Sequence, residues 1–265
     1  MAFLRALRLA LVLAGFVLIA APLQWLVVKF APSARAAIPM LFHRAVCGAM
    51  GVRVRVIGAP SPARPQLVVA NHISWLDISA MASGFPLWFL AKTEVGEWPV
   101  VGLLARLQGC LFVNRSRWRA IPEVNRQIAD CLRQGRALVL FPEATTGDGN
   151  RLLKFHSSHF EAAIAASGGD APARLQPVSI TYTRRNGLPY DRLTRPSIAW
   201  YGDMELLPHL WEILQNGPVD CELRFGPPIT AAPDSLRKEL AQLTRANIRA
   251  AIAAARQRDG GALEN

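Results

Sequence analysis

The chain has 265 residues, enough for one large domain, or for one domain with an appended segment, and for a sizeable core. Its 30 Lys and Arg residues outnumber 19 Asp and Glu residues, and the net charge of +11 favours an anionic partner: nucleic acid, an anionic membrane or a phosphate-bearing substrate. The four cysteines form no C-x-x-C pair and have no histidine at metal-ligand spacing, which disfavours a disulfide framework and a zinc site, so we expect no metal.

The first element in chain order is an apolar segment, Leu9 to Val28, which only Pro22 and Gln24 interrupt. Its length is close to the roughly 20 residues that a helix needs to span a bilayer. A secretory signal peptide is the alternative, because basic residues precede the segment and Ala34-Arg-Ala36 could serve as a cleavage site. Aromatic and basic residues at the end of the segment resemble interfacial anchors and favour a membrane segment. We therefore predict that residues 1–50 form a membrane-anchoring helical segment.

Residues 31–50 follow as a basic, amphipathic connector that could form a second helix in the membrane interface. The alternation in Val52–Ile57 then predicts a half-buried strand that ends at Gly58. Further strands are predicted at Leu67–Ala70, Leu87–Ala91, Cys110–Val113, Leu138–Phe141, Val178–Tyr182, Ile198–Tyr201 and Cys221–Phe225, and helices at Ile121–Leu132, Phe155–Ala166 and Ser235–Arg256. This alternation predicts, for residues 51–265, an α/β fold with a mixed, largely parallel sheet flanked by helices.

The segment Val68–Asp77 ends an apolar run with Asn71 and His72, and Asp77 follows five residues after the histidine. In one continuous helix these two side chains would lie roughly 140° apart. A strand precedes them, however, and Ser74–Asp77 has the form of a capping box. His72 is therefore expected in the turn and Asp77 in the first helical turn, where the carboxylate can fix the imidazole tautomer for base catalysis. The alternative is that Asp77 caps the helix and His72 is an ordinary packed residue.

Nucleophilic side chains are not apparent near this pair. No G-x-S-x-G motif occurs in the chain, which disfavours an ordinary serine hydrolase. Ser74 is too close in sequence to His72 to be a convincing nucleophile. A base without a nucleophilic side chain implies that the substrate supplies the attacking group.

Basic residues also follow a second predicted strand, at Arg115, Arg117 and Arg119. Arginines at the carboxyl end of a strand are well placed to hold an anionic group with two hydrogen bonds, although a solvated basic loop is the alternative.

A third segment, Leu138–Gly149, ends a buried strand with Pro142 and Glu143. Its glycines are typical of an ordinary turn. A carboxylate directly after four apolar residues would nevertheless be costly without a fixed partner, so Glu143 is a candidate site residue.

Four ordered blocks of sequence carry a resemblance to a known family. They are N-H-x-x-x-x-D at Asn71, His72 and Asp77; an aromatic residue with arginine three places later at Phe112 and Arg115; F-P-E-x-T at Phe141, Pro142, Glu143 and Thr145; and an apolar strand with proline at Leu175–Ile180. Together they resemble the glycerolipid acyltransferase family, whose type member acylates 1-acylglycerol-3-phosphate. The third block is commonly F-P-E-G-T-R in that family, and this chain departs from it at Ala144 and Thr146. The resemblance covers roughly Asn71 to Tyr182 and the N-terminal membrane segment.

The resemblance implies a membrane-bound O-acyltransferase that moves an acyl group from acyl-CoA or acyl-carrier protein to the hydroxyl of a lysolipid, with 1-acylglycerol-3-phosphate first. In that family scheme His72 is the base, Asp77 orients it and Arg115 holds the acceptor phosphate. Substrate contacts are implied at Phe112, Arg115, Glu143, Thr145 and Pro177. No metal and no cofactor other than the acyl donor is implied.

Two other functions stay open from the sequence. Thr146 stands where the family commonly has arginine, so a phosphate-free acceptor such as lyso-ornithine lipid is an alternative. The other is a non-catalytic lipid-binding membrane protein. Nucleic acid is not expected as a partner, because the basic residues lack an interleaved aromatic platform.

The expected location is the cell inner membrane, with the catalytic domain facing the cytoplasm. Acyl thioesters are cytosolic, and basic residues after the apolar segment outnumber those before it, which places the domain side inside. A re-entrant or interfacial hairpin would satisfy the same constraint.

Overall fold

The computed structural model describes residues 1–99, 101–113, 121–168 and 172–260. Its strands form one mixed sheet in the order β1-β8-β6-β2-β5-β3-β4, and β7 and β9 pair with β6. The bounds are β1 Val52–Ile57, β2 Gln66–Ala70, β3 Trp88–Lys92, β4 Leu111–Val113, β5 Leu138–Leu140, β6 Ala173–Arg185, β7 Leu188–Pro189, β8 Val219–Phe225 and β9 Ile229–Ala231. The predicted α/β fold with a mixed sheet is confirmed.

The central strand β2 is parallel to both of its neighbours, β5 and β6. The pairs β3–β5, β3–β4 and β1–β8 are also parallel, whereas β6 runs antiparallel to β8, β7 and β9. Parallel strands end at the same edge of a sheet, so the segments that follow β2 and β5 meet there. Ligand sites in open α/β sheets commonly form outside this carboxyl edge.

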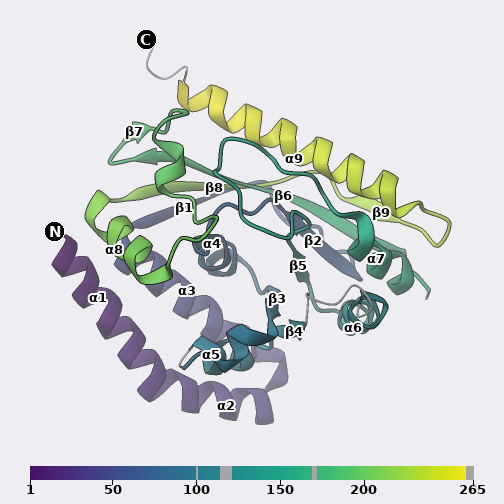
Figure 1. Ribbon diagram of the computed structural model, residues 1–265. Helices are drawn as coiled ribbons and strands as arrows, with labels where there is room; N and C mark the ends of the chain where they lie inside the picture. The colour runs from purple at the N-terminus through teal and green to yellow at the C-terminus, as the bar shows by residue number, and fades with distance from the viewer. Residues whose placement is uncertain (100, 114–120, 169–171, 261–265) are drawn as a thin grey trace.

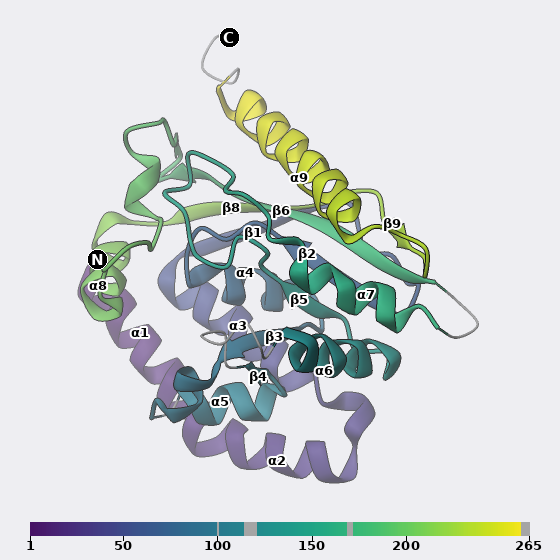
Figure 2. The same cartoon turned by 45° about the vertical axis from the view of Figure 1, so that its right-hand side comes forward.

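Helices cover both faces of the sheet (Figures 1 and 2). Their bounds are α1 Ala2–Gly15, α2 Ala21–Phe30, α3 Ala37–Met50, α4 Leu76–Gly84, α5 Val101–Gln108, α6 Ile121–Arg133, α7 Glu161–Ala166, α8 Leu206–Asn216 and α9 Arg237–Gly260. One core contains residues of α1, α3, α4 and α8, and the other contains residues of α6, α7 and α9. The fold is thus three layers of helices, sheet and helices.

The sequence of β2 explains why it lies between two cores. Val68 and Ala70 belong to the core under α3 and α4, whereas Leu67 and Val69 belong to the core under α6, α7 and α9. All four side chains are fully buried. Alternate residues of a strand point to opposite faces, so an apolar run without polar alternation is what a strand covered on both faces requires.

The N-terminal helices form one run from Ala2 to Phe30, with a π-helical turn at Phe16–Ala20 between α1 and α2. In the described part of the chain, this run is the one helix long and apolar enough to cross a membrane. One side of it contacts the domain: Arg5 Nη1 donates to the carbonyl of Leu214 at 2.9 Å, and Gln24 Nε2 donates to that of Leu107 at 3.1 Å.

The other side of this run is apolar and exposed. Its exposed large side chains include Phe3, Leu7, Leu11, Leu18, Ile19, Leu23, Trp25 and Phe30. The helix therefore lies along the domain with an uncovered apolar face. The connector after it also contains a helix, α3, which buries Val46, Cys47 and Met50 in the core.

The predicted strand Ile198–Tyr201 is wrong. This segment follows a 3-10 turn at Arg195–Ser197 and forms no strand, although Ile198 and Ala199 are buried in the core. Its apolar residues fill the core without pairing with the sheet, a difference that a four-residue run cannot reveal. The predicted helix Phe155–Ala166 begins later, as a 3-10 turn at Ser157–Phe160 followed by α7.

Candidate active site

The site lies where β2 and β5 end. Asn71 and His72 follow β2 directly, and Glu143 lies three residues beyond β5. The carboxylate of Glu143 joins the two segments, because Oε1 accepts from the backbone amide of His72 at 2.8 Å and Oε2 accepts from that of Leu153 at 2.7 Å. Glu143 therefore has the fixed partners that its position after an apolar strand requires, and both partners are backbone groups.

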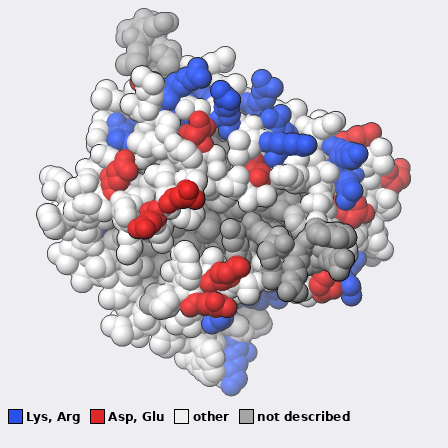
Figure 3. Space-filling model, viewed as in Figure 1, with Lys and Arg blue, Asp and Glu red and all other residues white. Residues whose placement is uncertain are grey.

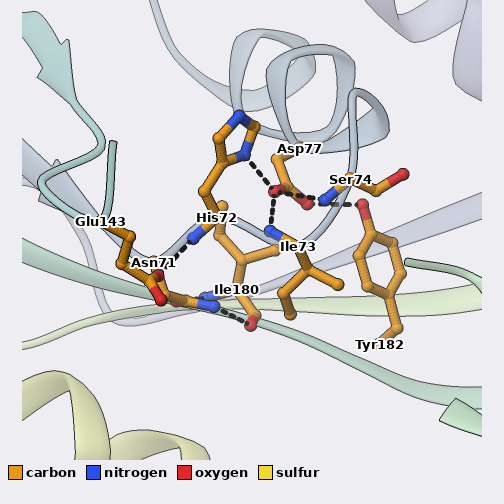
Figure 4. Close-up of polar contacts among 8 residues, drawn as sticks. All are labelled: Asn71, His72, Ile73, Ser74, Asp77, Glu143, Ile180 and Tyr182. Atoms are coloured by element: carbon orange, nitrogen blue, oxygen red, sulfur yellow. Dashed lines mark hydrogen bonds and ion pairs between the residues drawn. The ribbon is translucent and has the colours of Figure 1, made fainter. Parts of the chain in front are cut away.

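His72 and Asp77 meet as expected, with the histidine Nδ1 and the Asp77 Oδ2 2.8 Å apart (Figure 4). A carboxylate accepts hydrogen bonds, so in the neutral imidazole this contact places the proton on Nδ1 and leaves a lone pair on Nε2. Asp77 is fully buried, whereas the His72 side chain is 19% exposed. Figure 4 shows Nε2 on the side of the ring facing away from Asp77, and His72 is among the residues that line a cavity.

The Asp77 carboxylate also organises the turn between the two residues. Its Oδ2 accepts from the backbone amides of Ile73 at 2.7 Å and Ser74 at 3.0 Å. The hydroxyl of Ser74 has no hydrogen-bond partner in the described part of the structure, so only the acidic half of the predicted capping box forms. The helix-cap and His72-partner interpretations of Asp77 are therefore both correct, and they are not alternatives.

Two further contacts hold the start of the motif. The imidazole of His72 stacks on the ring of Phe141, with centroids 4.1 Å apart and planes inclined by 15°. The side chain of Asn71 donates to the carbonyl of Ile180 at 2.9 Å and accepts from its amide at 2.8 Å. The imidazole of His72 is thus fixed by an aromatic face, and the residue before it is fixed to β6.

The hydroxyl of Tyr182 donates to Asp77 Oδ1 at 2.8 Å (Figure 4). Burial raises the pKa of Tyr182 well above its usual range, and the Asp77 charge raises it further, so the phenol remains protonated and can donate. Burial likewise raises the pKa of Glu143, while the two backbone amides that it accepts from act in the opposite direction.

Sequence reasoning did not single out Tyr182. The signal available was one phenol in the apolar strand prediction Val178–Tyr182, since a buried tyrosine hydroxyl needs a hydrogen-bond partner. That signal does not identify the partner.

The other predicted site residues lie farther from this group. Phe112 is on β4, and β3 and β5 separate that strand from β2. Thr145 is exposed in the loop after Glu143. Pro177 is buried in β6, opposite Val69 and ahead of Ile180. Arg115 lies outside the described residues, as do Arg117 and Arg119.

The loop after Glu143 is held against His72 by arginines of α9. The amide of Gly147 donates to the carbonyl of His72 at 3.1 Å. Arg256 donates to the carbonyls of Gly149 at 2.6 Å and Asn150 at 3.1 Å. Arg245 donates to the carbonyls of Leu152 and Leu153, both at 2.9 Å. The C-terminal helix therefore supports the segment that packs on the candidate base.

Comparisons with known proteins match the chain to acyltransferases. The sequence profile of the Acyltransferase family matches residues 53–181. A lyso-ornithine lipid O-acyltransferase of Brucella abortus is 40% identical over 94% of this chain and 95% of its own length. A 1-acyl-sn-glycerol-3-phosphate acyltransferase of Neisseria meningitidis is 36% identical over 79% of this chain and 78% of its own length.

A solved structure shares the fold over almost the whole chain. The crystal structure of the 1-acyl-sn-glycerophosphate acyltransferase from Thermotoga maritima superposes with a TM-score of 0.68 at 20% identity, covering 96% of this chain and 97% of the other. At this identity the likeness concerns the fold. The fold, the N-H-x-x-x-x-D geometry and the extent of these similarities together place the chain in the glycerolipid acyltransferase family, as an acyltransferase that acts on lysolipids.

Proposed function

We propose that this enzyme transfers a fatty acyl group from a thioester, acyl-CoA or acyl-carrier protein, to the hydroxyl of lyso-ornithine lipid. The choice of this acceptor is supported by the extent of similarity to two lyso-ornithine lipid O-acyltransferases. The Brucella abortus relative matches 94% of the chain, and one from Rhizobium meliloti is 39% identical over 88% of it. This reverses the order expected from the sequence, in which 1-acylglycerol-3-phosphate came first.

The chemistry follows from the tautomer of His72. Its Nε2 takes the proton of the acceptor hydroxyl while the oxygen attacks the thioester carbonyl. Asp77 stabilises the imidazolium that forms. The carbon–sulfur bond then breaks, the thiolate leaves, and the imidazolium returns the proton to the sulfur. The attacking group belongs to the substrate, so the scheme contains no acyl-enzyme and needs no metal or other cofactor.

Thr146 supports an acceptor without phosphate. It stands where the family commonly has arginine, in the loop that follows Glu143. An arginine there would supply a charged, two-point grip on phosphate. Threonine offers a neutral hydroxyl instead, which lowers the advantage of a phosphorylated acceptor.

A second candidate acceptor is 1-acylglycerol-3-phosphate, which would give phosphatidic acid. Relatives named for this activity in Neisseria meningitidis and Neisseria gonorrhoeae are each 36% identical, over 79% and 74% of the chain. Arg115, the family's position for phosphate, is present in the sequence. A non-catalytic lipid-binding role has no comparable support, because His72 and Asp77 are intact and correctly paired.

The exposed apolar face of α1 and α2 supports attachment to the inner membrane with the domain on the cytoplasmic side. In Figure 3 the surface over α1 is mostly uncharged, while Lys and Arg side chains gather over α9 at the opposite end. An apolar helix face that lies along the domain suits insertion into the near leaflet, as a re-entrant or interfacial element. The acyl donors are cytosolic, which sets the orientation.

The test is competition between the two lysolipids for purified enzyme in detergent, with acyl-CoA and acyl-carrier protein assayed separately. We expect more acylated ornithine lipid than phosphatidic acid. Thr146→Arg should shift the product ratio about tenfold toward phosphatidic acid, the lower end of what a charge-assisted hydrogen bond contributes. Gln242→Arg, which adds the same charge at an exposed position of α9, should leave the ratio unchanged. Wild-type enzyme that acylates only the phosphorylated acceptor would refute the proposed acceptor.

A further inference from the structure

We propose that Tyr182 is a positioning residue of the acyl-transfer reaction, which acts through Asp77 to keep His72 unprotonated and correctly oriented. The Tyr182 hydroxyl donates a hydrogen bond to Asp77 Oδ1, the carboxylate oxygen that does not bind His72. In the kinetic measurements below, the inference rests on the proposed function, whereas the titration of His72 does not depend on the acceptor.

The geometry divides the Asp77 carboxylate into two halves. Oδ2 accepts from His72 and from the two backbone amides of the turn. Oδ1 accepts from the phenol of Tyr182 at 2.8 Å, across 105 residues of sequence. Both the carboxylate and the phenol are buried, Asp77 at 0% and Tyr182 at 2% exposure. Without this donor, a buried carboxylate oxygen would lose its side-chain partner.

Strand β6 therefore holds both ends of the catalytic motif. The backbone of Ile180 binds Asn71, which precedes the histidine, and the side chain of Tyr182 binds Asp77, which ends the motif. These two β6 residues are only two positions apart, so one short stretch of strand makes both contacts. The distance between the base and its carboxylate is set by one rigid element rather than by the turn alone.

In the described part of the chain, the titratable and charged groups near this pair come from several elements. The cavity that His72 and Tyr182 line also contains three arginines, Arg151, Arg195 and Arg256. Glu143, from the loop after β5, binds the His72 backbone, and burial raises its pKa. Cys221 on β8 and Cys47 on α3 are the thiols near Tyr182. Burial raises the pKa of Cys47 to about 12 and that of Cys221 well above its usual range, so both stay neutral in the working pH range.

The phenol affects the base through charge. A hydrogen bond to Oδ1 draws electron density from the carboxylate, which weakens its pull on a proton at His72. Removal of the phenol concentrates negative charge on the His72 side and favours the imidazolium in the resting enzyme. The pair then protonates as a unit at higher pH, and less of the base is available near neutrality.

Tyr182→Phe tests this with almost no change in volume. The protonation of His72 is followed by NMR on protein labelled with 13C-histidine, and the resonance among the chain's five histidines is assigned from His72→Gln. We expect the midpoint of the titration to move to higher pH, by about half a unit or more. Tyr190→Phe is the matched control, because its buried phenol accepts from Arg185 rather than binding Asp77. An unchanged midpoint in Tyr182→Phe would overturn the inference.

A second substitution covers the case in which Tyr182→Phe does not fold. 3-Fluorotyrosine at position 182 keeps the hydroxyl and makes it a stronger donor, so the midpoint should move to lower pH. A midpoint that does not move, or moves to higher pH, contradicts the proposal as firmly as the first result would.

Kinetics give the matching measurement. Per folded enzyme, Tyr182→Phe should lower kcat about threefold or more at pH 7, with KM for both substrates within about twofold and the acid limb of kcat/KM shifted to higher pH. In an Asp77→Asn background the same substitution should have little further effect, because Tyr182 acts through the carboxylate. Fully additive losses would overturn the inference. If the titration shifts but no acceptor turns over, the proposed function fails and the positioning role stands.

Discussion

Asn71 and Ile180 are joined in both directions by one side-chain amide, which donates to the Ile180 carbonyl and accepts from its backbone N–H. Asn71 is 2% exposed, so neither bond can be replaced by water without rearrangement. The two hydrogen bonds link the turn that carries His72 to β6, as a pair of backbone hydrogen bonds links neighbouring strands. Only a side-chain amide can both donate and accept in this way. A polar side chain of similar size without both groups would not hold His72 in the same position.

Asn71→Asp should show this dependence. The carboxylate can still accept from the Ile180 amide, but its second oxygen would face the Ile180 carbonyl, and a buried polar group left unpaired costs about 1–3 kcal/mol. We expect a lower melting temperature and at least tenfold lower kcat per folded enzyme, about 1.4 kcal/mol. Asn247→Asp, which loses an exposed side-chain bond to the Leu243 carbonyl within α9, is the control. Equal melting temperatures of both variants and wild type would contradict the account.

Glu143 predicts a pH dependence of stability. Burial raises its pKa in the folded protein, so between the unfolded value of about 4.3 and the higher native value the folded chain binds more protons. Stability therefore falls as the pH rises through that interval. Glu143→Gln, which cannot titrate, should show a flatter profile, measured as melting temperature between pH 4 and 7. Parallel profiles of wild type and variant would show that Glu143 does not contribute.

His43 should make stability depend on pH in the opposite direction from Glu143. It is buried between Ser79 and Gln108, and burial lowers its pKa. Between the native value and the unfolded value of about 6.5, the unfolded chain binds more protons, so stability is lost as the pH falls through this interval. His43→Gln should reduce that loss, whereas the exposed His156→Gln should not. The check is chemical denaturation at pH 7.5 and 5.5, and identical losses in wild type and His43→Gln would count against it.

Arg256 is predicted to keep the loop after Glu143 in place. Arg256→Gln removes charged donors to Gly149 and Asn150, and hydrogen bonds of this kind contribute about 1.5–3 kcal/mol. We expect faster tryptic cleavage after Arg151 and Lys154 and a several-fold lower kcat, because this loop packs on His72 through Gly147. Arg249→Gln, on the exposed side of the same helix, is the control. Cleavage at the wild-type rate in Arg256→Gln would contradict the supporting role of α9.

The sequence was sufficient for the strands that carry apolar runs with clear ends. β1 is predicted to the residue, and β2 is predicted within one residue because its run stops at Asn71. The meeting of His72 and Asp77 also follows from local spacing, since the turn and the first helical turn bring them together. Local pattern is informative where the interacting residues are close in the chain.

The remainder depends on contacts between distant segments. Tyr182 reaches Asp77 across 105 residues, and no periodicity encodes that pair. The start of α4 is predicted by the capping-box pattern at Ser74–Asp77, but its extent is not, because Leu76, Ala80 and Met81 belong to a helix that is buried almost all round and lacks a polar face. The segment Ile198–Tyr201 looked like a strand because buried loops and strands can share the same short apolar run.

The central claim is that His72, oriented by Asp77, is the base for acyl transfer to a lysolipid hydroxyl. The most direct measurement is single-turnover acyl transfer by purified His72→Ala, with melting temperature and membrane association recorded on the same sample. We predict a folded, membrane-associated protein whose transfer rate is about 10²- to 10⁴-fold below wild type, the usual contribution of a general base. Asp77→Asn should be severely impaired as well. A transfer rate of His72→Ala close to that of wild type would contradict the account.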